Sequence, residues 1–489
     1  MCNYVIFCQI RAGGGEKRRP VPLAPGCAPP PGCIMLAGMA IAKAAFVCFG
    51  EVNTPREIIE AKAAKARRWL QEAGLELITT EPVSDDAEGR DVRRAVEAFR
   101  GQEFDLLVAC VAGWIPSHAV LGVLEPFRHK PVLLWGLAGW TEGGRLLTTA
   151  DQAGTSALRK PLADLGYRFK YVYEVAGAEP RMAAITAFAR AARAVSALRG
   201  ARIGMMGYRD MQLYGTLYDG VSLKAALGVE IEFFEMLEMV QRSEKLEPAA
   251  VQEVVAGLAR RWKFLKPAEP ATLEKGARYY LALRDKARER AWQGVSLIDV
   301  DGMKKLLNFP PAMVFMLLAE DPGVCVVPEN DALGAVTQLV VRHLTGQAAA
   351  YLEFYEFMED RVLAGVPDFV PPQVVEGEVR VLPSRFGLLG EGVLNVSKVK
   401  TGELTLCRLT HTGDRYALHA VTGRGVEPRR WEEAGWAQPA PQLPGLEVIL
   451  DTPVEEFAQR VMSQHYILAY GRQLEPLSDF CRLTGIELL

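Results

Sequence analysis

From Ala44 onward, apolar positions follow two alternating periodicities. Short apolar runs, typical of buried strands, are each followed by a stretch in which apolar residues recur at helical spacing. The segment 45–49 is the first of these strands, and 56–73 is the first helix. Because strands that alternate with helices of this length form parallel sheets covered on both faces, the pattern predicts an α/β fold.

The alternation occurs in two successive units. The expected elements are 45–49, 56–73, 75–79, 91–100, 104–110 and 131–136 in the first unit, and 202–207, 229–233, 295–300, 325–328 and 331–345 in the second. We place the first α/β domain at 44–165 and the second at 166–355, with the boundary in the polar region between Asp151 and Arg181.

After Val366 the chain changes to short β-type runs separated by glycines, which favour turns. The expected runs are 378–382, 392–399, 403–409 and 415–420, with short helices over 454–462 and 476–483. The pattern predicts a β-rich, mostly antiparallel and barrel-like domain over 356–489.

Residues 1–43 differ in composition from the rest of the chain. Consecutive glycines, a basic run at 17–19 and a proline-rich tract cannot build a packed core, so we expect a disordered extension. The basic run before the apolar stretch 34–42 superficially resembles a signal peptide. The favoured interpretation is an upstream extension, with Met35 or Met39 as the native start.

Composition narrows the class of protein. The chain has 489 residues, 49% of them hydrophobic and 24% charged, which is the balance of a soluble protein with several domains. The net charge of -3 provides no positive electrostatic field that would attract nucleic acid. The sequence contains no apolar stretch long enough to predict a membrane span. Nine cysteines without a Cys-x-x-Cys pair favour reduced thiols in the cytoplasm over a zinc site.

Two carboxylates and one histidine are the candidate chemistry. Glu329 follows an apolar strand and precedes the helix 331–345, so it lies at the strand end where open α/β sheets place ligand groups. Glu353 begins the next extended segment, and His465 lies late in the chain. This donor set holds a divalent metal while leaving positions open for substrate. The pattern alone leaves another interpretation open, with two surface acids and one structural histidine.

Several segments resemble the L-fucose isomerase family, in the same order, over about 44–489. They are Glu329-Asn330-Asp331-Ala332-Leu333-Gly334-Ala335 with Glu353 downstream, and the segments 49–55, 204–214, 423–428 and 465–471. The resemblance implies two Rossmann-like, doubly wound α/β domains followed by the β-rich domain. It also implies a homo-oligomer, often a hexamer, that interconverts an aldose and its ketose.

The resemblance assigns roles to individual residues. Glu329, Glu353 and His465 become ligands of Mn²⁺, or of Co²⁺ or Mg²⁺, and the two glutamates also become the acid–base pair that acts through an enediol. Four further residues are implied to bind substrate. These are Trp114 and His118, which close the pocket of a neighbouring subunit, and Met211 and Tyr214, which contact the sugar.

The substrate class follows less directly. Fucose isomerases carry aspartate where Glu353 stands, whereas arabinose isomerases carry glutamate, and this chain is shorter than typical fucose isomerases. We expect a deoxy-hexose or pentose of the L-fucose or D-arabinose type, without naming the sugar or separating proton transfer from a hydride shift. The alternative function is a non-catalytic sugar-binding or regulatory protein on the same fold.

Overall fold

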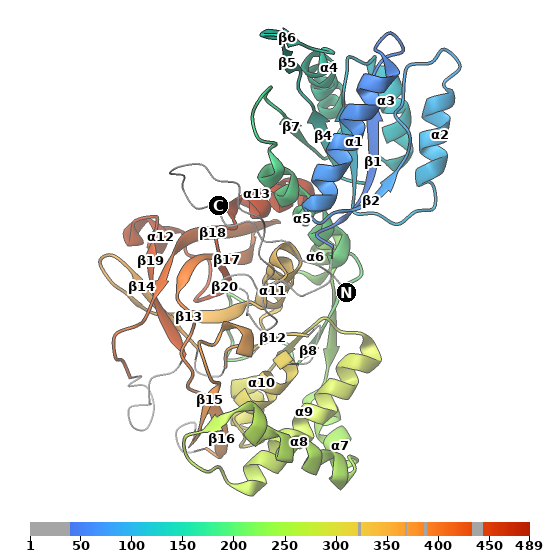
Figure 1. Ribbon diagram of the computed structural model, residues 1–489. Helices are drawn as coiled ribbons and strands as arrows, with labels where there is room; N and C mark the ends of the chain where they lie inside the picture. Colours follow the sequence, from blue (N-terminus) through green and yellow to red (C-terminus); the bar gives the residue numbers. More distant parts are fainter. Residues whose placement is uncertain (1–39, 321–323, 367–368, 386–388, 433–443) are drawn as a thin grey trace, which may run out of the picture. The chain divides into compact units, whose positions relative to one another are not determined.

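The computed structural model describes residues 40–320, 324–366, 369–385, 389–432 and 444–489 (Figure 1). The expected N-terminal extension lies outside these residues, apart from 40–43, and so do both candidate start methionines.

The first sheet contains five parallel strands in the order β2-β1-β3-β4-β7. Its strands are β1 Lys43–Phe49, β2 Glu76–Thr79, β3 Leu106–Val111, β4 Val132–Gly136 and β7 Phe169–Tyr173. The helices are α1 Arg56–Glu72, α2 Arg90–Phe99, α3 Ser117–Leu124, α4 Asp151–Asp164 and α5 Met182–Leu198, and a small hairpin is formed by β5 Trp140–Glu142 and β6 Arg145–Leu147. Figure 1 shows helices on both faces of this sheet.

Side chains of each strand alternate between two cores. Phe46 and Val108 pack with α1 and α5, whereas Val47 and Leu107 pack with α2, α3 and α4. This alternation follows from the two-residue period of a strand, and it explains why the strands are apolar throughout. The expectation of parallel sheets is confirmed here.

The second sheet has the order β12-β11-β8-β9 and is also parallel. Its strands are β8 Arg202–Met206, β9 Glu230–Phe234, β11 Gly294–Leu297 and β12 Cys325–Val327. The helices around it are α6 Gly220–Leu227, α7 Met236–Glu244, α8 Pro248–Arg261, α9 Pro270–Arg290, α10 Ala312–Glu320 and α11 Ala332–Thr345.

One expected strand of this sheet ends early. The sequence predicts a strand over 295–300, but β11 ends at Leu297 and a π-helical turn, Asp299–Lys304, follows. The amides of Val300 and Asp301 donate to the carboxylate of Asp210 at 2.8 Å each, instead of to a neighbouring strand. A tertiary hydrogen-bond acceptor therefore overrides the local β propensity.

The C-terminal part contains a closed, antiparallel barrel. Its strands are β13 Ala350–Phe357, β14 Val362–Gly365, β17 Gly402–Thr412, β18 Arg415–Val426, β19 Gly445–Leu450 and β20 His465–Tyr470. They pair in the order β17-β20-β13-β14-β19-β18, and the β17–β18 hairpin closes the circle, which confirms the barrel-like expectation. β21 Glu487–Leu488 adds to β18 in parallel.

The runs expected at 378–382 and 392–399 lie elsewhere. They form β15 Arg380–Arg385 and β16 Glu391–Asn395, which join β10 Lys263–Phe264 in a separate sheet. The first sheet also takes β7 from beyond residue 165, and β13 of the barrel spans residue 355. The described residues belong to one unit of contacts, and the domain bounds stay predictions.

Helix α11 joins the second sheet to the barrel. Asp331 caps its first turn by accepting a hydrogen bond from the Gly334 amide at 2.8 Å, and Gly346 ends it in the left-handed conformation. Its buried residues pack against β17 and β20 in the same core. Each fully buried Leu or Val there contributes about 1.5–3 kcal/mol.

Two further observations bear on the class of protein. The cysteines of the described residues, Cys48, Cys110, Cys325, Cys407 and Cys481, are buried and free. None of the described helices has the length and hydrophobicity that crossing a bilayer requires. A cytoplasmic location stays a prediction.

His343, in the last turn of α11, makes stability depend on pH. Burial, and then the charges of Arg342 and Arg193, lower its pKa to about 4. An unfolded histidine titrates near about 6.5, so between these values the unfolded chain binds a proton that the folded protein does not, and stability falls as pH falls. We expect the free energy of unfolding to fall by about 2–3 kcal/mol through this group as the pH is lowered from 7 to 4.

Urea unfolding of the wild type and of His343→Gln across this range measures the effect. The variant should lose less stability than the wild type on acidification, because glutamine binds no proton. Asp210, whose raised pKa acts with the opposite sign, is common to both proteins and cancels in the difference. Parallel stability curves for the two proteins would contradict the assignment.

Candidate active site

Glu329 lies in a strained turn directly after β12. Both Glu329 and Asn330 have left-handed backbones, with φ of 63° and 52°. The Glu329 amide donates to Asp299 Oδ1 at 2.8 Å, and the Asn330 amide donates to the Leu297 carbonyl at 3.1 Å. The side-chain amide of Asn330 donates to the Met206 carbonyl at 2.7 Å. Such conformations cost about 1–3 kcal/mol each, and they persist here because the ends of β8 and β11 fix them.

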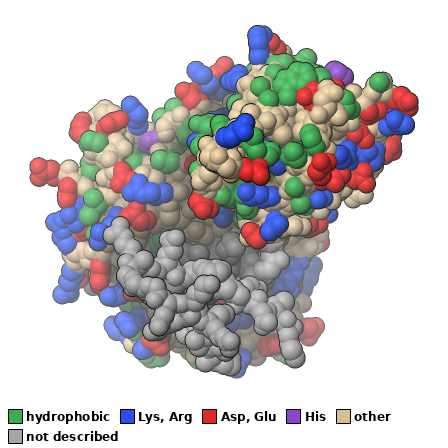
Figure 2. Space-filling view, turned by 45° about the horizontal axis from the view of Figure 1, so that its top comes forward, with side chains coloured by type: hydrophobic (Ala, Val, Ile, Leu, Met, Phe, Trp, Pro, Cys, Tyr) green, Lys and Arg blue, Asp and Glu red, His purple; other side chains and the backbone are tan. Residues whose placement is uncertain are grey.

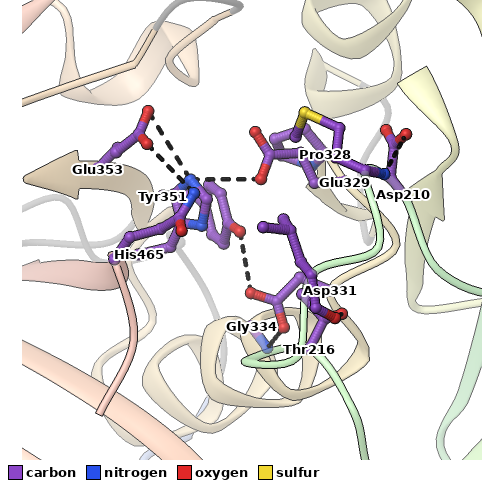
Figure 3. Close-up of polar contacts among 12 residues, drawn as sticks. Asp210, Thr216, Pro328, Glu329, Asp331, Gly334, Tyr351, Glu353 and His465 are labelled. Carbon is purple, nitrogen blue, oxygen red and sulfur yellow. Dashed lines mark hydrogen bonds and ion pairs between the residues drawn. The ribbon is translucent and has the colours of Figure 1, made fainter. Parts of the chain in front are cut away.

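Glu353 and His465 face each other across two barrel strands. They are direct partners in the antiparallel β13–β20 register, so their side chains lie on the same face of the barrel wall. His465 Nε2 lies 4.0 Å from Glu353 Oε2 and 3.5 Å from Glu329 Oε2 (Figure 3). The three residues predicted from the sequence therefore meet, although they come from three separate segments.

Burial sets the state of the imidazole. His465 is 2% exposed and Glu329 is 5% exposed, whereas Glu353 is partly exposed and also accepts a hydrogen bond from Gln464 Nε2 at 3.2 Å. Removal from water lowers the pKa of His465 to about 3, against a smaller opposing effect of Asp331. The imidazole is thus neutral at neutral pH, as a metal ligand or hydrogen-bond acceptor must be.

A buried network fixes the His465 ring. The ring stacks on Tyr351, with centroids 4.5 Å apart and planes at 22°. The Tyr351 hydroxyl donates to Asp331 Oδ2 at 2.9 Å, and Arg408 of β17 forms an ion pair with the same carboxylate (Figure 3 shows the tyrosine and the aspartate). Asp331 therefore caps α11 and also holds Tyr351, the residue on which His465 stacks.

The charges of this network are balanced. Burial alone would raise the pKa of Asp331, but the charge and hydrogen bonds of Arg408 lower it below its usual range. Burial, together with the charges of Asp331 and Glu329, raises the pKa of Tyr351 well above its ordinary value, so its hydroxyl stays a donor. His465 consequently lies beside a neutral phenol and a compensated carboxylate.

The chemistry of Glu329, Glu353 and His465 fits a divalent metal. Two carboxylates and one neutral imidazole are common donors for Mn²⁺ and related ions. Within the described residues, however, no group of three or more His, Cys, Asp or Glu side chains is already arranged so that it could hold an ion. The donor types are therefore present at one place, and metal binding itself stays a prediction.

Met211 and Tyr214 lie in the loop after β8. Met211 has a left-handed backbone, and its amide donates to Asp210 Oδ1 at 3.0 Å and to Asp301 Oδ2 at 2.8 Å. Tyr214 is 79% exposed, and the next residue, Gly215, accepts a hydrogen bond from Arg408 at 3.0 Å. The loop is thus tied to the network that supports His465, and the sugar contacts stay predictions.

Trp114 and His118 lie at the carboxyl edge of the first sheet. Trp114 follows β3, its amide donates to the Thr149 carbonyl at 2.7 Å, and its side chain is exposed. His118 lies in the first turn of α3. Their predicted contact with a neighbouring subunit concerns a second chain, and it stays a prediction.

Sequence reasoning missed several supporting residues. Asp210 is fully buried, and burial together with the charge of Asp299 raises its pKa to about 7. Lys304 forms an ion pair with Asp299 at 3.0 Å, and Arg408 is buried within the buried stretch 404–410 of β17. One signal was available, because a charged residue inside a mostly apolar run such as 404–409 requires a buried partner.

Comparison with known proteins adds a second line of evidence. No protein-family model matches the chain. A sulfoquinovose isomerase of Priestia aryabhattai is 21% identical over 468 residues, which cover 90% of this chain and 97% of that protein, and the sulfoquinovose isomerase of Priestia megaterium gives the same values. An L-arabinose isomerase of a Nocardioides species is 23% identical over 323 residues, or 62% of each chain.

The chain resembles sugar isomerases. Each of these relatives carries the name of an isomerase that acts on a sugar, and the similarity to the first two extends over most of both chains. The comparisons support a sugar isomerase family at this coarser level, without singling out L-fucose isomerase.

Proposed function

We propose that the protein is a metal-dependent aldose–ketose isomerase. The observation that carries the proposal is the meeting of Glu329 and Glu353 at the neutral, buried imidazole of His465. The distant similarity to isomerases named for sulfoquinovose and L-arabinose supports an intramolecular oxidoreductase acting on a sugar. A deoxy-hexose or pentose of the L-fucose or D-arabinose type is the substrate class that we infer.

Glu329, Glu353 and His465 would hold a divalent ion, for which we propose Mn²⁺, with Co²⁺ or Mg²⁺ as alternatives. When bound, the ion supplies Lewis-acid polarisation of the sugar's carbonyl and hydroxyl oxygens. Burial supports this role, because it keeps His465 unprotonated and available as a donor.

The two carboxylates provide the acid–base chemistry. Moving a carbonyl between neighbouring sugar carbons requires one base that takes a proton from carbon and one group that moves the hydroxyl proton. Glu329 and Glu353 lie within 4.0 Å of the same imidazole nitrogen, on two different elements. We assign the two proton transfers to this pair, with the strained turn holding Glu329 in a fixed direction.

The assay that tests this function uses the full chain with Mn²⁺. The expected result is ketose formation from at least one of L-fucose, D-arabinose, L-arabinose and sulfoquinovose, and loss of activity with a chelator. Solvent deuterium in the product would support proton transfer, and its absence a hydride shift. Bound metal without turnover of any aldose would favour the alternative, a sugar-binding or regulatory protein.

His465→Ala is expected to weaken Mn²⁺ binding by at least about tenfold, because it removes the one nitrogen donor of the set. Titration with Mn²⁺, followed by calorimetry or by electron paramagnetic resonance, measures the affinity directly. His411→Ala, which removes another barrel histidine, is the matched control and should bind Mn²⁺ like the wild type. Unchanged affinity in His465→Ala would remove this residue from the ligand set.

We also propose a homo-oligomer, with the hexamer of the resembled family as the first expectation. Several apolar side chains of the first α/β unit are exposed, among them Val52, Trp114, Leu146, Leu147, Tyr173 and Val175. Figure 2 shows hydrophobic side chains grouped near the upper edge of the surface turned forward. Such a patch is typical of protein interfaces, and light scattering measures the assembly.

A further inference from the structure

Left-handed backbones are concentrated at the proposed active site. Of the seven non-glycine residues with positive φ in the described chain, four form two consecutive pairs. One pair is Glu329 and Asn330, and the other is Met211 and Gln212. Conformations of this kind persist only where the surroundings over-determine them, so specific neighbouring groups must hold the two pairs.

Asp299 holds the first pair. Its Oδ1 accepts the hydrogen bond from the Glu329 amide at 2.8 Å. The same carboxyl group forms an ion pair at 3.0 Å with Lys304, and both side chains are buried. Because the π-helical turn carries both residues, the acceptor of the Glu329 amide is fixed inside one short segment.

Asp210 holds the second pair. Its Oδ1 accepts from the Met211 amide at 3.0 Å and from the Asp301 amide at 2.8 Å, and its Oδ2 accepts from the Val300 amide at 2.8 Å. Asp210 therefore fastens the loop after β8 to the π-helical turn that also carries Asp299.

A purely structural role would explain why Asp210 and Asp299 are buried, but it would not explain which backbone amides donate to them. Asp210 caps the first turn of the π-helical segment, but it also accepts from the amide of the strained residue Met211, and Asp299 accepts from the amide of the strained residue Glu329. One of these amides belongs to the proposed catalytic residue Glu329. The direction of that side chain thus depends on a hydrogen bond that its own backbone donates.

We propose that Asp299 and Asp210 are positioning residues, which hold Glu329 and the Met211 loop in register with each other across the π-helical turn. The proposal rests on the proposed function for the role of Glu329, while the backbone geometry that it explains is independent of any reaction. Asp299 sets the direction of the carboxylate that moves protons. Asp210 sets the loop expected to contact the sugar.

The test compares Asp299→Ala with Asp299→Asn. Asparagine keeps an oxygen that accepts the Glu329 amide, whereas alanine removes it. We expect Asp299→Ala to lower kcat by about 100-fold, because misplacing a catalytic group by about 1 Å has effects of this size, with KM changed less than about threefold. Asp299→Asn should retain kcat within about tenfold of the wild type. Asp285→Ala, at a surface aspartate of α9, is the matched control.

Crystal structures provide a readout that does not depend on activity. In Asp299→Ala, Glu329 should leave the left-handed region and its carboxylate should move away from His465, whereas in Asp299→Asn both should stay. If Asp299→Ala does not fold, Asp299→Ser carries the same test, because its side chain is too short to replace the acceptor. An unchanged Glu329 backbone in a folded variant that lacks the acceptor would overturn the proposal.

The double variant tests whether the two acids act together. Asp210→Ala alone should raise KM more than it lowers kcat, because it releases the Met211 loop. If the pair acts as one device, Asp210→Ala combined with Asp299→Ala should lose clearly less than the product of the single losses in kcat/KM. Fully multiplicative losses would overturn the shared role. Absence of turnover in the wild type would instead reject the proposed function, and the structures would still decide the positioning role.

Discussion

Glu329→Gln is expected to lower kcat for ketose formation by about 10³-fold, the size of effect typical for loss of a general acid–base group. Glutamine has nearly the same shape as glutamate but cannot accept the substrate proton. The backbone contacts that hold the turn, from the Glu329 amide to Asp299 and from the Asn330 amide to Leu297, do not involve the carboxylate and remain. The fold and the assembly should therefore survive.

Steady-state kinetics with a turned-over aldose measures the loss, and light scattering and circular dichroism check the fold. Glu356→Gln is the matched control, because Glu356 lies on the same strand as Glu353 but is exposed. Its kcat should remain within about twofold of the wild type, as for an ordinary surface substitution. If Glu329→Gln retains more than about a tenth of the activity, the acid–base role of Glu329 is wrong.

Local signals predicted the frame that carries Glu329. The expected strand 325–328 and the expected helix 331–345 are both encoded within about twenty residues, which is the range of the local strand and helix rules. The structure confirms both elements as β12 and α11, each with one bound that differs by a single residue. A single strand or helix is predictable in this way because its pattern reflects its own buried face.

The meeting of Glu353 and His465 depends on long-range strand pairing and not on a local pattern. It follows from the register of β13 against β20, which closure of the whole barrel sets, and no local pattern encodes that register. The sequence offered both residues as candidates, but only the resemblance of their surrounding segments favoured their meeting over the alternative of a surface acid and a structural histidine. The early end of β11 has the same origin, because Asp210, 90 residues before Val300, captures the amide that a strand would have paired.

For Arg408, the sequence can indicate that a partner is needed, but only the structure identifies that partner. Arg408 lies between Cys407 and Leu409 in the buried stretch 404–410 of β17, and its side chain is fully buried, so a charged partner is required there. The structure identifies the partner as Asp331, which also accepts from Tyr351 and caps α11. Removal of the arginine should therefore affect both stability and the site.

Arg408→Met is expected to destabilise the protein by about 3–5 kcal/mol, because it leaves the Asp331 carboxylate buried without its counter-ion. Methionine fills much of the same space, so the loss reports the uncompensated charge more than a cavity. The double variant Asp331→Asn with Arg408→Met should recover a large part of the loss, since asparagine removes the charge. Its Oδ1 can still cap α11, and its Nδ2 then faces the Tyr351 hydroxyl as a donor in place of the second carboxylate oxygen.

Urea unfolding measures both variants, and the exposed pair of Lys160 and Asp164 on α4 provides the comparison. Lys160→Met should change the free energy of unfolding by less than about 1 kcal/mol, as for surface ion pairs in general. A similarly small change for Arg408→Met would mean that Asp331 finds another counter-charge or a proton. The stacking of Tyr351 on His465 would then not depend on the ion pair, and the positioning of the imidazole would rest on the barrel strands alone.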